Sequence, residues 1–133
     1  MRAVVALLSA LLAIGAAAAP VPPTARAEID GLLARLEKSA CRFNRGGTWY
    51  TGAEAKAHLL RKLKYMEDRG MIQTTEQFIE RAAASSSTTG EPYLVKCGDA
   101  PPVKSGLWLA AELQAMRSSG ADRHQGTTGG RAP

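Results

Sequence analysis

Four polar side chains recur on one face of the helix predicted over residues 53–69. Glu54, His58, Arg61 and Tyr65 are spaced i, i+4, i+7 and i+11, which places them in one stripe of an α-helix. In a functional interpretation, Glu54 orients His58, and the imidazole then acts as a base or binds an anion with flanking cations. In the structural interpretation, which we favour, the stripe is a solvated face with i,i+4 pairs of about 0.2–0.5 kcal/mol each.

A run of hydroxyl side chains, Ser85–Thr89, ends at Gly90 and predicts a loop. Its serines could supply a nucleophile to His58 and Glu54, but neither G-x-S-x-G nor S-x-x-K is present. The same hydroxyls, with backbone N–H groups near Gly90, could instead hold a phosphate or a sugar. We therefore assign no catalytic residue. The candidate ligand-binding residues are Arg45, Glu54, His58, Arg61, Tyr65, Ser86, Ser87 and Gly90.

Basic residues gather around this stripe, although the overall charge excess is small. The chain carries 17 Lys and Arg against 12 Asp and Glu, for a formal net charge of +5. Acidic residues interleave with the basic ones, so the pattern does not predict nucleic-acid binding. It fits contact with an anionic polymer or lipid headgroups, an attraction that weakens with salt. The chain has two histidines, and His124 lies in a polar tail, so neither a metal site nor a cofactor is expected.

Residues 1–19 have the parts of a secretory signal peptide. A basic Met1-Arg2 precedes an apolar run, and small residues with A-x-A sites follow. The run is shorter than the ~20 residues that span a bilayer, so no stable membrane insertion is expected after cleavage. Cleavage sites after Ala18, Ala19 and Ala27 stay open. Removal of Arg2 lowers the net charge of +5 by one. We expect a periplasmic or secreted protein.

Two cysteines, Cys41 and Cys97, remain after cleavage. In an oxidising compartment an even pair predicts a disulfide. The loop that it would close is long, and the chain-entropy model gives about 4 kcal/mol of stabilisation. A catalytic dithiol is a weaker alternative because the C-x-x-C spacing is absent.

Hydrophobic periodicity and turn residues predict a small single α+β domain over residues 28–117. It follows a Pro-rich linker over 20–27 and precedes a disordered tail over 118–133. The fold class is about four helices with a short three-stranded antiparallel sheet and one disulfide. The predicted elements are a helix over 28–38, a hairpin over 41–50, a helix over 53–69, a shorter helix after Thr74, a strand over 92–97 and a helix over 107–117.

The motifs together resemble the YfeK-like family of small exported bacterial proteins, whose domain is one of unknown function. The resemblance covers residues 28–113 and implies an exported, periplasmic protein with no established activity, cofactor or catalytic residue. Four segments carry it: Phe43-x-Arg45-x-Gly47, Thr51-x-x-Glu54-Ala55-x-x-His58-Leu59-x-Arg61-Lys62-Leu63, Thr75-Glu76-Gln77-Phe78-Ile79 and Ser85-Ser86-Ser87-Thr88-Thr89-Gly90-x-Pro92-Tyr93-x-Val95-Lys96.

The leading hypothesis is a non-enzymatic accessory or binding module for an anionic or glycan-like envelope ligand or a partner protein. The alternative is a small periplasmic hydrolase that uses His58 with a loop serine. A hydrogen bond between His58 and the Ser85–Ser87 hydroxyls would favour the hydrolase. A third hypothesis, an interaction protein that acts through exposed Trp49 and Trp108, requires an apolar surface patch.

Overall fold

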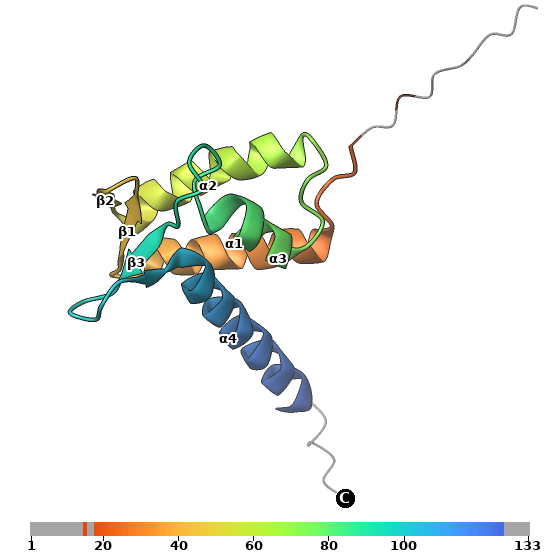
Figure 1. The fold of residues 1–133 in the computed structure, drawn as a ribbon. Coiled ribbons are helices and arrows are strands. Elements are labelled where there is room, and N and C mark those ends of the chain that lie inside the picture. Colours follow the sequence, from red (N-terminus) through yellow and green to blue (C-terminus); the bar gives the residue numbers. More distant parts are fainter. Residues whose placement is uncertain (1–14, 16–17, 127–133) are drawn as a thin grey trace, which may run out of the picture.

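The computed structural model describes residues 15 and 18–126. Most of the predicted signal peptide and the end of the predicted tail, residues 127–133, lie outside the described residues. The described chain is an α+β domain in which helices pack beside a small antiparallel sheet (Figure 1). Its elements are α1 (Pro23–Lys38), β1 (Arg42–Arg45), β2 (Thr48–Tyr50), α2 (Gly52–Glu67), α3 (Thr75–Phe78), η1 (Ile79–Ala83), β3 (Leu94–Lys96), β4 (Val103–Lys104) and α4 (Ser105–Gly126).

Helix α1 begins earlier than the sequence predicts. The predicted linker over 20–27 is helical from Pro23, because proline suits the first helical turn, where its missing N–H needs no partner. The apolar stripe of this helix, Ile29, Leu32, Leu33 and Leu36, is buried, and Val21 and Ala25 join the same core. Cleavage after Ala27 would therefore remove two core residues, whereas cleavage after Ala18 or Ala19 would keep them.

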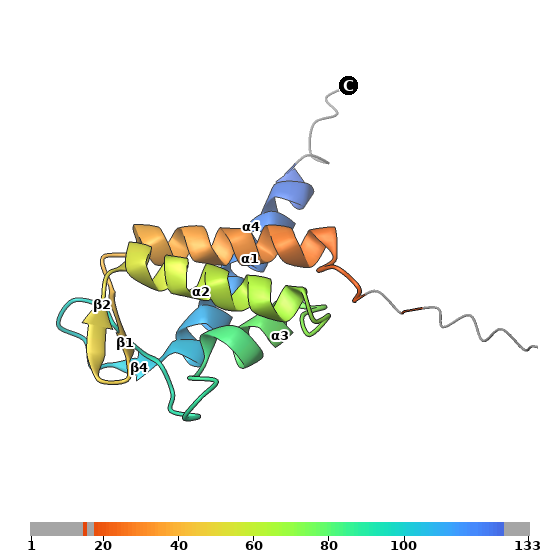
Figure 2. The same cartoon turned by 90° about the horizontal axis from the view of Figure 1, so that it is seen from above.

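Helix α2 lies antiparallel beside α1, as Figure 2 shows. It starts with the capping box that Thr51-x-x-Glu54 predicts. The Thr51 hydroxyl accepts from the backbone N–H of Glu54, and the Glu54 carboxylate accepts from the backbone N–H of Thr51. Leu59, Leu63 and Met66 are buried against the core. At its first residue, Gly52, a Cβ would collide with the backbone carbonyl of Leu36, so glycine allows the two helices to approach closely here.

The sheet has four antiparallel strands in the order β2-β1-β3-β4, which corrects the predicted three. The added strand is the dipeptide Val103–Lys104 next to Pro102, too short to give an alternating pattern. The predicted disulfide between Cys41 and Cys97 is present. It joins the start of β1 to the end of β3, where Arg42 pairs with Lys96.

The short helix after Thr74 changes from α3 into a π-helical turn, η1. The Thr74 hydroxyl caps its start by accepting from the N–H of Gln77. The apolar side of this short helical segment is buried, with Phe78, Ala82 and Ala83 fully enclosed. The π-helical turn ends at the hydroxyl loop, Ser85–Gly90.

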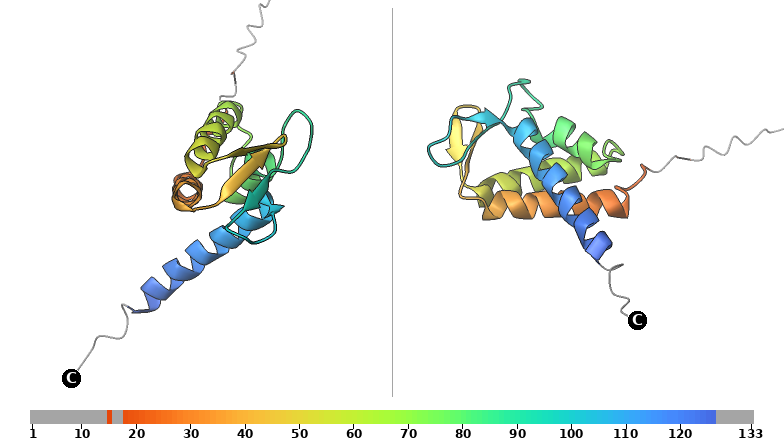
Figure 3. Two further views of the ribbon diagram at one scale, coloured as in Figure 1. Left: turned by 90° about the vertical axis from the view of Figure 1, so that its left-hand side faces the viewer. Right: turned by 90° about the horizontal axis from the view of Figure 1, so that it is seen from below.

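Helix α4 crosses the other helices and its far end extends beyond them, as Figure 3 shows. Leu109 and Leu113 are buried in the core. The helix continues to Gly126, so residues 118–126 are helical where the sequence predicts disorder. Trp108 is half-buried, with its ring edge-on to Phe43 at 5.8 Å. The third hypothesis requires both tryptophans to be exposed. Trp49 is exposed but Trp108 is not, so the structure does not support it.

Candidate functional site

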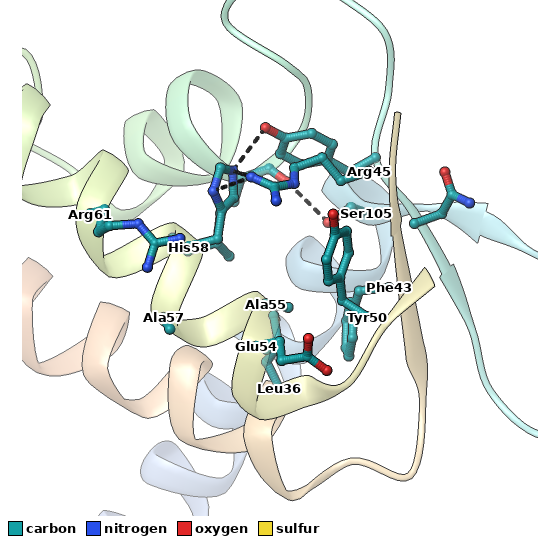
Figure 4. Close-up of a pocket in the computed structure, with 14 residues that line it drawn as sticks. Leu36, Phe43, Arg45, Tyr50, Glu54, Ala55, Ala57, His58, Arg61 and Ser105 are labelled. Atoms are coloured by element: carbon teal, nitrogen blue, oxygen red, sulfur yellow. Dashed lines mark hydrogen bonds between the residues drawn. The ribbon is translucent and has the colours of Figure 1, made fainter. Parts of the chain in front are cut away.

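Two pockets lie side by side between α2, the sheet and the hydroxyl loop. We call the first the cationic pocket; its volume is about 560 Å³. The second, the apolar pocket, has a volume of about 260 Å³ and is shown in Figure 4. The cationic pocket is lined by Arg45, His58, Arg61, Lys62, Tyr65, Met66, Met71, Ser86, Ser87, Thr88 and Tyr93.

Three of the side chains that line both pockets form a hydrogen-bonded row. Arg45, at the end of β1, donates from Nη1 to Nδ1 of His58 at 2.6 Å. Nε2 of His58 lies 3.2 Å from the Tyr93 hydroxyl. Figure 4 shows the Arg45 guanidinium beside the His58 imidazole. The three residues come from β1, α2 and the residue before β3, so the sheet and helix must pack correctly for the row to form.

His58 is neutral at physiological pH. Burial lowers its pKa to about 4, and the positive charges of Arg45, Lys62 and Arg61 act in the same direction. An arginine can only donate, so Nδ1 must be the acceptor, and we assign the proton to Nε2, which donates to the Tyr93 hydroxyl. The imidazole therefore positions its neighbours and has no free lone pair with which to act as a base.

Lys62 connects α2 to the hydroxyl loop. Its ammonium donates to the carbonyl of Ser85 at 2.9 Å and to the Tyr93 hydroxyl at 3.2 Å, and it lies over the Tyr93 ring. Burial and the charge of Arg45 lower the pKa of Lys62, and burial raises the pKa of Tyr93. An ammonium has three N–H donors, so one remains for a ligand.

Arg61 and Tyr65 complete the α2 side of the cationic pocket. Arg61 is exposed and, within residues 18–126, its guanidinium makes no hydrogen bond or ion pair. Tyr65 is 56% exposed, and the Arg69 guanidinium lies over its ring at 3.5 Å. Within the predicted polar stripe, Arg61 therefore forms part of the pocket wall, and Tyr65 lies at the exposed edge of the pocket.

The hydroxyl loop forms the opposite side and is held by its own hydrogen bonds. The Ser86 hydroxyl accepts from the N–H groups of Thr88 and Thr89, which leaves its O–H free to donate. Ser86 and Ser87 both line the cationic pocket, next to His58 and Arg61. Gly90 adopts a positive φ of 75° that closes the turn, and it lines neither pocket.

In contrast to the functional interpretation of the stripe, Glu54 makes no hydrogen bond to His58 among the described residues. Its carboxylate accepts instead from the backbone N–H of Thr51 at 3.2 Å and from the Thr51 hydroxyl at 2.9 Å. The capping box turns the side chain back toward the helix start, away from the residue four positions ahead. Glu54 lies on the apolar pocket and not on the cationic one.

Sequence reasoning missed two residues that the structure places at the centre of the site. By spacing alone, Lys62 lies beside the polar stripe of its helix, and Tyr93 lies in the strand predicted over 92–97. Both belong to the segments that carried the family resemblance, which was the one available signal. Their contact depends on β3 packing against α2, and local spacing does not predict it.

The cationic pocket has positive charge without a counter-charge. Among the residues that the structure describes, no acidic side chain lines it, and Arg45, Arg61 and Lys62 form no ion pair. Over the same residues there is no group of three or more His, Cys, Asp or Glu that could hold a metal ion. No helix within the described ranges has the length and apolar character needed to cross a membrane.

Comparison with known proteins places both pockets in a domain of unassigned role. The model of a family of unknown function, DUF5329, matches residues 23–117, which contain every residue that lines the two pockets. The chain is 40% identical over 94 residues to the uncharacterized protein YfeK of Salmonella typhimurium (strain LT2), a match that covers 70% of this chain and 77% of that protein. No solved structure matches the chain.

Proposed function

Because the chain belongs to the family of unknown function DUF5329, which confirms the resemblance to YfeK, we propose a function from the site itself: non-enzymatic binding of a small anionic ligand in the cationic pocket. The ligand class is one with a phosphate, sulfate or carboxylate group. The single observation that carries the proposal is the cluster of Arg45, Arg61 and Lys62 around one pocket that lacks an acidic wall among the described residues.

The electrostatics of His58 support this proposal independently of the pocket's shape. All three cations lower its pKa, which means that each one already contributes positive potential at the imidazole. An anion placed beside them would relieve this mutual repulsion, and Arg45 and Lys62 are already half-buried, so binding adds less desolvation cost at these two groups. Charge-assisted hydrogen bonds of this kind are about twice as strong as neutral ones.

Four of the lining groups have a donor to offer. Arg61 presents a whole guanidinium fork, which suits two oxygens of one anionic group. Lys62 has its third N–H, and Ser86 has its hydroxyl proton. Arg45 has donors beyond the one used on His58, since a guanidinium carries five N–H groups.

The hydrolase alternative gains no support from the hydrogen bonds of the site. His58 is bonded to Arg45 and Tyr93, and no hydrogen bond links it to Ser85, Ser86 or Ser87 among the described residues. A general base also needs a pKa near the working pH, whereas the pKa of His58 is about 4. We therefore propose binding without catalysis.

The place of action is part of the same proposal. A structural disulfide fits an oxidising compartment, since such bonds are rare in the cytosol. Residues 1–19 have the composition of an export signal. The protein is thus proposed to bind its ligand in the periplasm or outside the cell.

Titration of the oxidised protein with inorganic phosphate at low salt tests the proposal. We expect a dissociation constant on the order of 1 mM or below, which corresponds to about −4 kcal/mol. Arg61→Gln should weaken binding about five- to tenfold, because it removes a charged fork that makes no hydrogen bond or ion pair with the described residues. Lys64→Gln is the matched control, since Lys64 lies on the same helix, is exposed and lines neither pocket. Absence of calorimetric heat and of NMR shifts in the pocket, for phosphate and for sulfate and acetate alike, would refute the function.

A further inference from the structure

The apolar pocket directly adjoins the proposed anion site. Arg45, His58, Arg61 and Tyr93 line both pockets. The two pockets are therefore neighbours, and a small molecule that lies across these shared residues would contact both.

The far side of the apolar pocket consists of core side chains. Leu36, Phe43 and Leu59 are buried, and each presents an apolar surface to the pocket. The alanines Ala55 and Ala83 line it as well, and their short side chains leave the space unfilled. Figure 4 shows Tyr50, Phe43 and Leu36 on one side of this space, with Arg45 and His58 at its other end.

Two features give the pair of pockets a polarity. Glu54 lies on the apolar pocket, and its carboxylate would repel an anionic group placed there. Arg45, which lines both pockets, lies over the Tyr50 ring with its guanidinium carbon 4.8 Å from the ring centroid. Its flat guanidinium can therefore stack on an apolar ring in one pocket while its N–H groups face an anion in the other.

We propose that the ligand is amphipathic: its anionic group lies in the cationic pocket and a ring or short hydrocarbon chain fills the apolar pocket. This inference rests on the proposed anion-binding function. The size of the apolar pocket, about 260 Å³, fixes the scale of the apolar part. A cavity of about 150 Å³ is enough for benzene, so one substituted aromatic ring or a chain of similar bulk fits.

The test compares three probes on the oxidised protein by calorimetry: methylphosphonate, phenylphosphonate and benzyl alcohol. The two phosphonates carry the same anionic group and differ in the apolar part, and neither is open to phosphate-ester hydrolysis. We expect phenylphosphonate to bind about tenfold or more tightly than methylphosphonate, because burying a ring removes a large apolar area from water. Benzyl alcohol should bind more weakly than phenylphosphonate.

Variants locate the extra affinity. Ala55→Leu should fill the apolar pocket, abolish the advantage of phenylphosphonate and leave methylphosphonate binding unchanged. Ala53→Leu is the matched control on the same helix, because Ala53 is exposed and lines neither pocket. If Ala55→Leu fails to fold, NMR of the wild-type protein replaces it. The backbone amides of Leu59 and Ala83 should then shift on addition of phenylphosphonate but not of methylphosphonate, and equal shifts would contradict the proposal.

The outcomes separate the two proposals. Equal affinities of wild-type protein for the two phosphonates would overturn the amphipathic ligand and leave the anion site standing. Equal loss of both phosphonates in Ala55→Leu would do the same, because the filled pocket would then not be specific to the ring. Failure of both phosphonates to bind would overturn the proposed function, and this inference with it.

Discussion

The Arg45 guanidinium donates a 2.6 Å hydrogen bond to Nδ1 of His58, so a permanent cation is paired with an imidazole that stays neutral. This relationship determines how the site can work. The bond occupies the lone pair that a general base would need, and it holds Arg45 at the boundary of the two pockets. His58 is therefore better described as a positioning residue for Arg45 and Tyr93 than as a reacting group.

Acidification should destabilise the fold through His58. Its pKa is about 4 in the folded protein and near 6.5 in the unfolded chain, so the unfolded chain binds the proton more readily in this window. Stability should be constant above about pH 6.5, fall as the pH drops, and lose about 1 kcal/mol by about pH 5, a discounted value because His58 is half-exposed. Urea unfolding at several pH values measures this slope.

His58→Asn provides the control for that slope. The variant should be less stable at neutral pH, yet its stability should be nearly constant between about pH 6.5 and about pH 5. The pKa values of Glu28 and Glu76 lie below the ordinary 4.5, so their contributions are lost at lower pH. An unchanged slope in His58→Asn would show that another group is responsible.

Loss of the disulfide should cost a large part of the stability. Cys41 and Cys97 are 56 positions apart, for which the chain-entropy model gives about 4 kcal/mol. The double variant Cys41→Ser/Cys97→Ser should unfold at a correspondingly lower urea concentration than the oxidised wild type. Reductant should lower the wild type to the same midpoint and leave the double variant unchanged. A loss below about 1 kcal/mol would contradict the entropic estimate.

Gly52→Ala should destabilise the protein, although alanine is the better helix former by about 1 kcal/mol. The added Cβ would collide with the Leu36 carbonyl, a backbone atom of α1 that cannot move aside like a side chain. We expect a net loss of about 1–3 kcal/mol, the usual range for overpacking. Gly120→Ala is the matched control, because Gly120 is helical and a Cβ added there would meet no atom within 4 Å. Stabilisation of both variants in thermal denaturation would refute the predicted contact.

Arg117→Gln should loosen the packing of α4 with little effect on the pockets. Arg117 donates from Nε and Nη2 to Glu28 on α1 and from Nη1 to Glu76 on α3. Its hydrogen bonds hold the pKa of both carboxyl groups below the ordinary value. The groups are largely solvated, so we expect a loss below about 1 kcal/mol, with a rise in the pKa of Glu28 visible by NMR titration. Lys64→Gln, which breaks an exposed pair with Asp68, should leave the pKa of Glu28 unchanged.

Periodicity and capping residues are enough to predict most of the fold. The stripe Ile29, Leu32, Leu33 and Leu36 and the box Thr51/Glu54 locate α1 and α2, because both signals depend on neighbours within a few residues. Strand β4 and residues 118–126 of α4 are missed because they lack such local signals. Val103–Lys104 pairs with β3 across a turn, and residues 118–126 have no apolar stripe to reveal a helix.

The site is only partly predictable, because one of its side chains has two possible local partners and another has a partner that is distant in sequence. Glu54 has both a capping partner three residues back and a histidine four residues ahead, and in the structure its carboxylate accepts from Thr51. Tyr93 reaches His58 across 35 positions of sequence, a separation at which spacing carries no information. The cationic pocket is lined by charged and hydroxyl residues that the sequence offers as candidates, whereas the partners that arrange them come from the tertiary structure.

The hydroxyl loop is closed before any ligand arrives. The N–H of Ser86 donates to the Glu91 carbonyl and the N–H of Gly90 to the Ser86 carbonyl, both at 2.9 Å, and Lys62 holds the carbonyl of Ser85. A loop that is already ordered loses little conformational entropy on association, in contrast to a segment that folds around its ligand. Binding should therefore be rapid, with a rate set by diffusion and electrostatic attraction, and differences in affinity between ligands should appear in their rates of release.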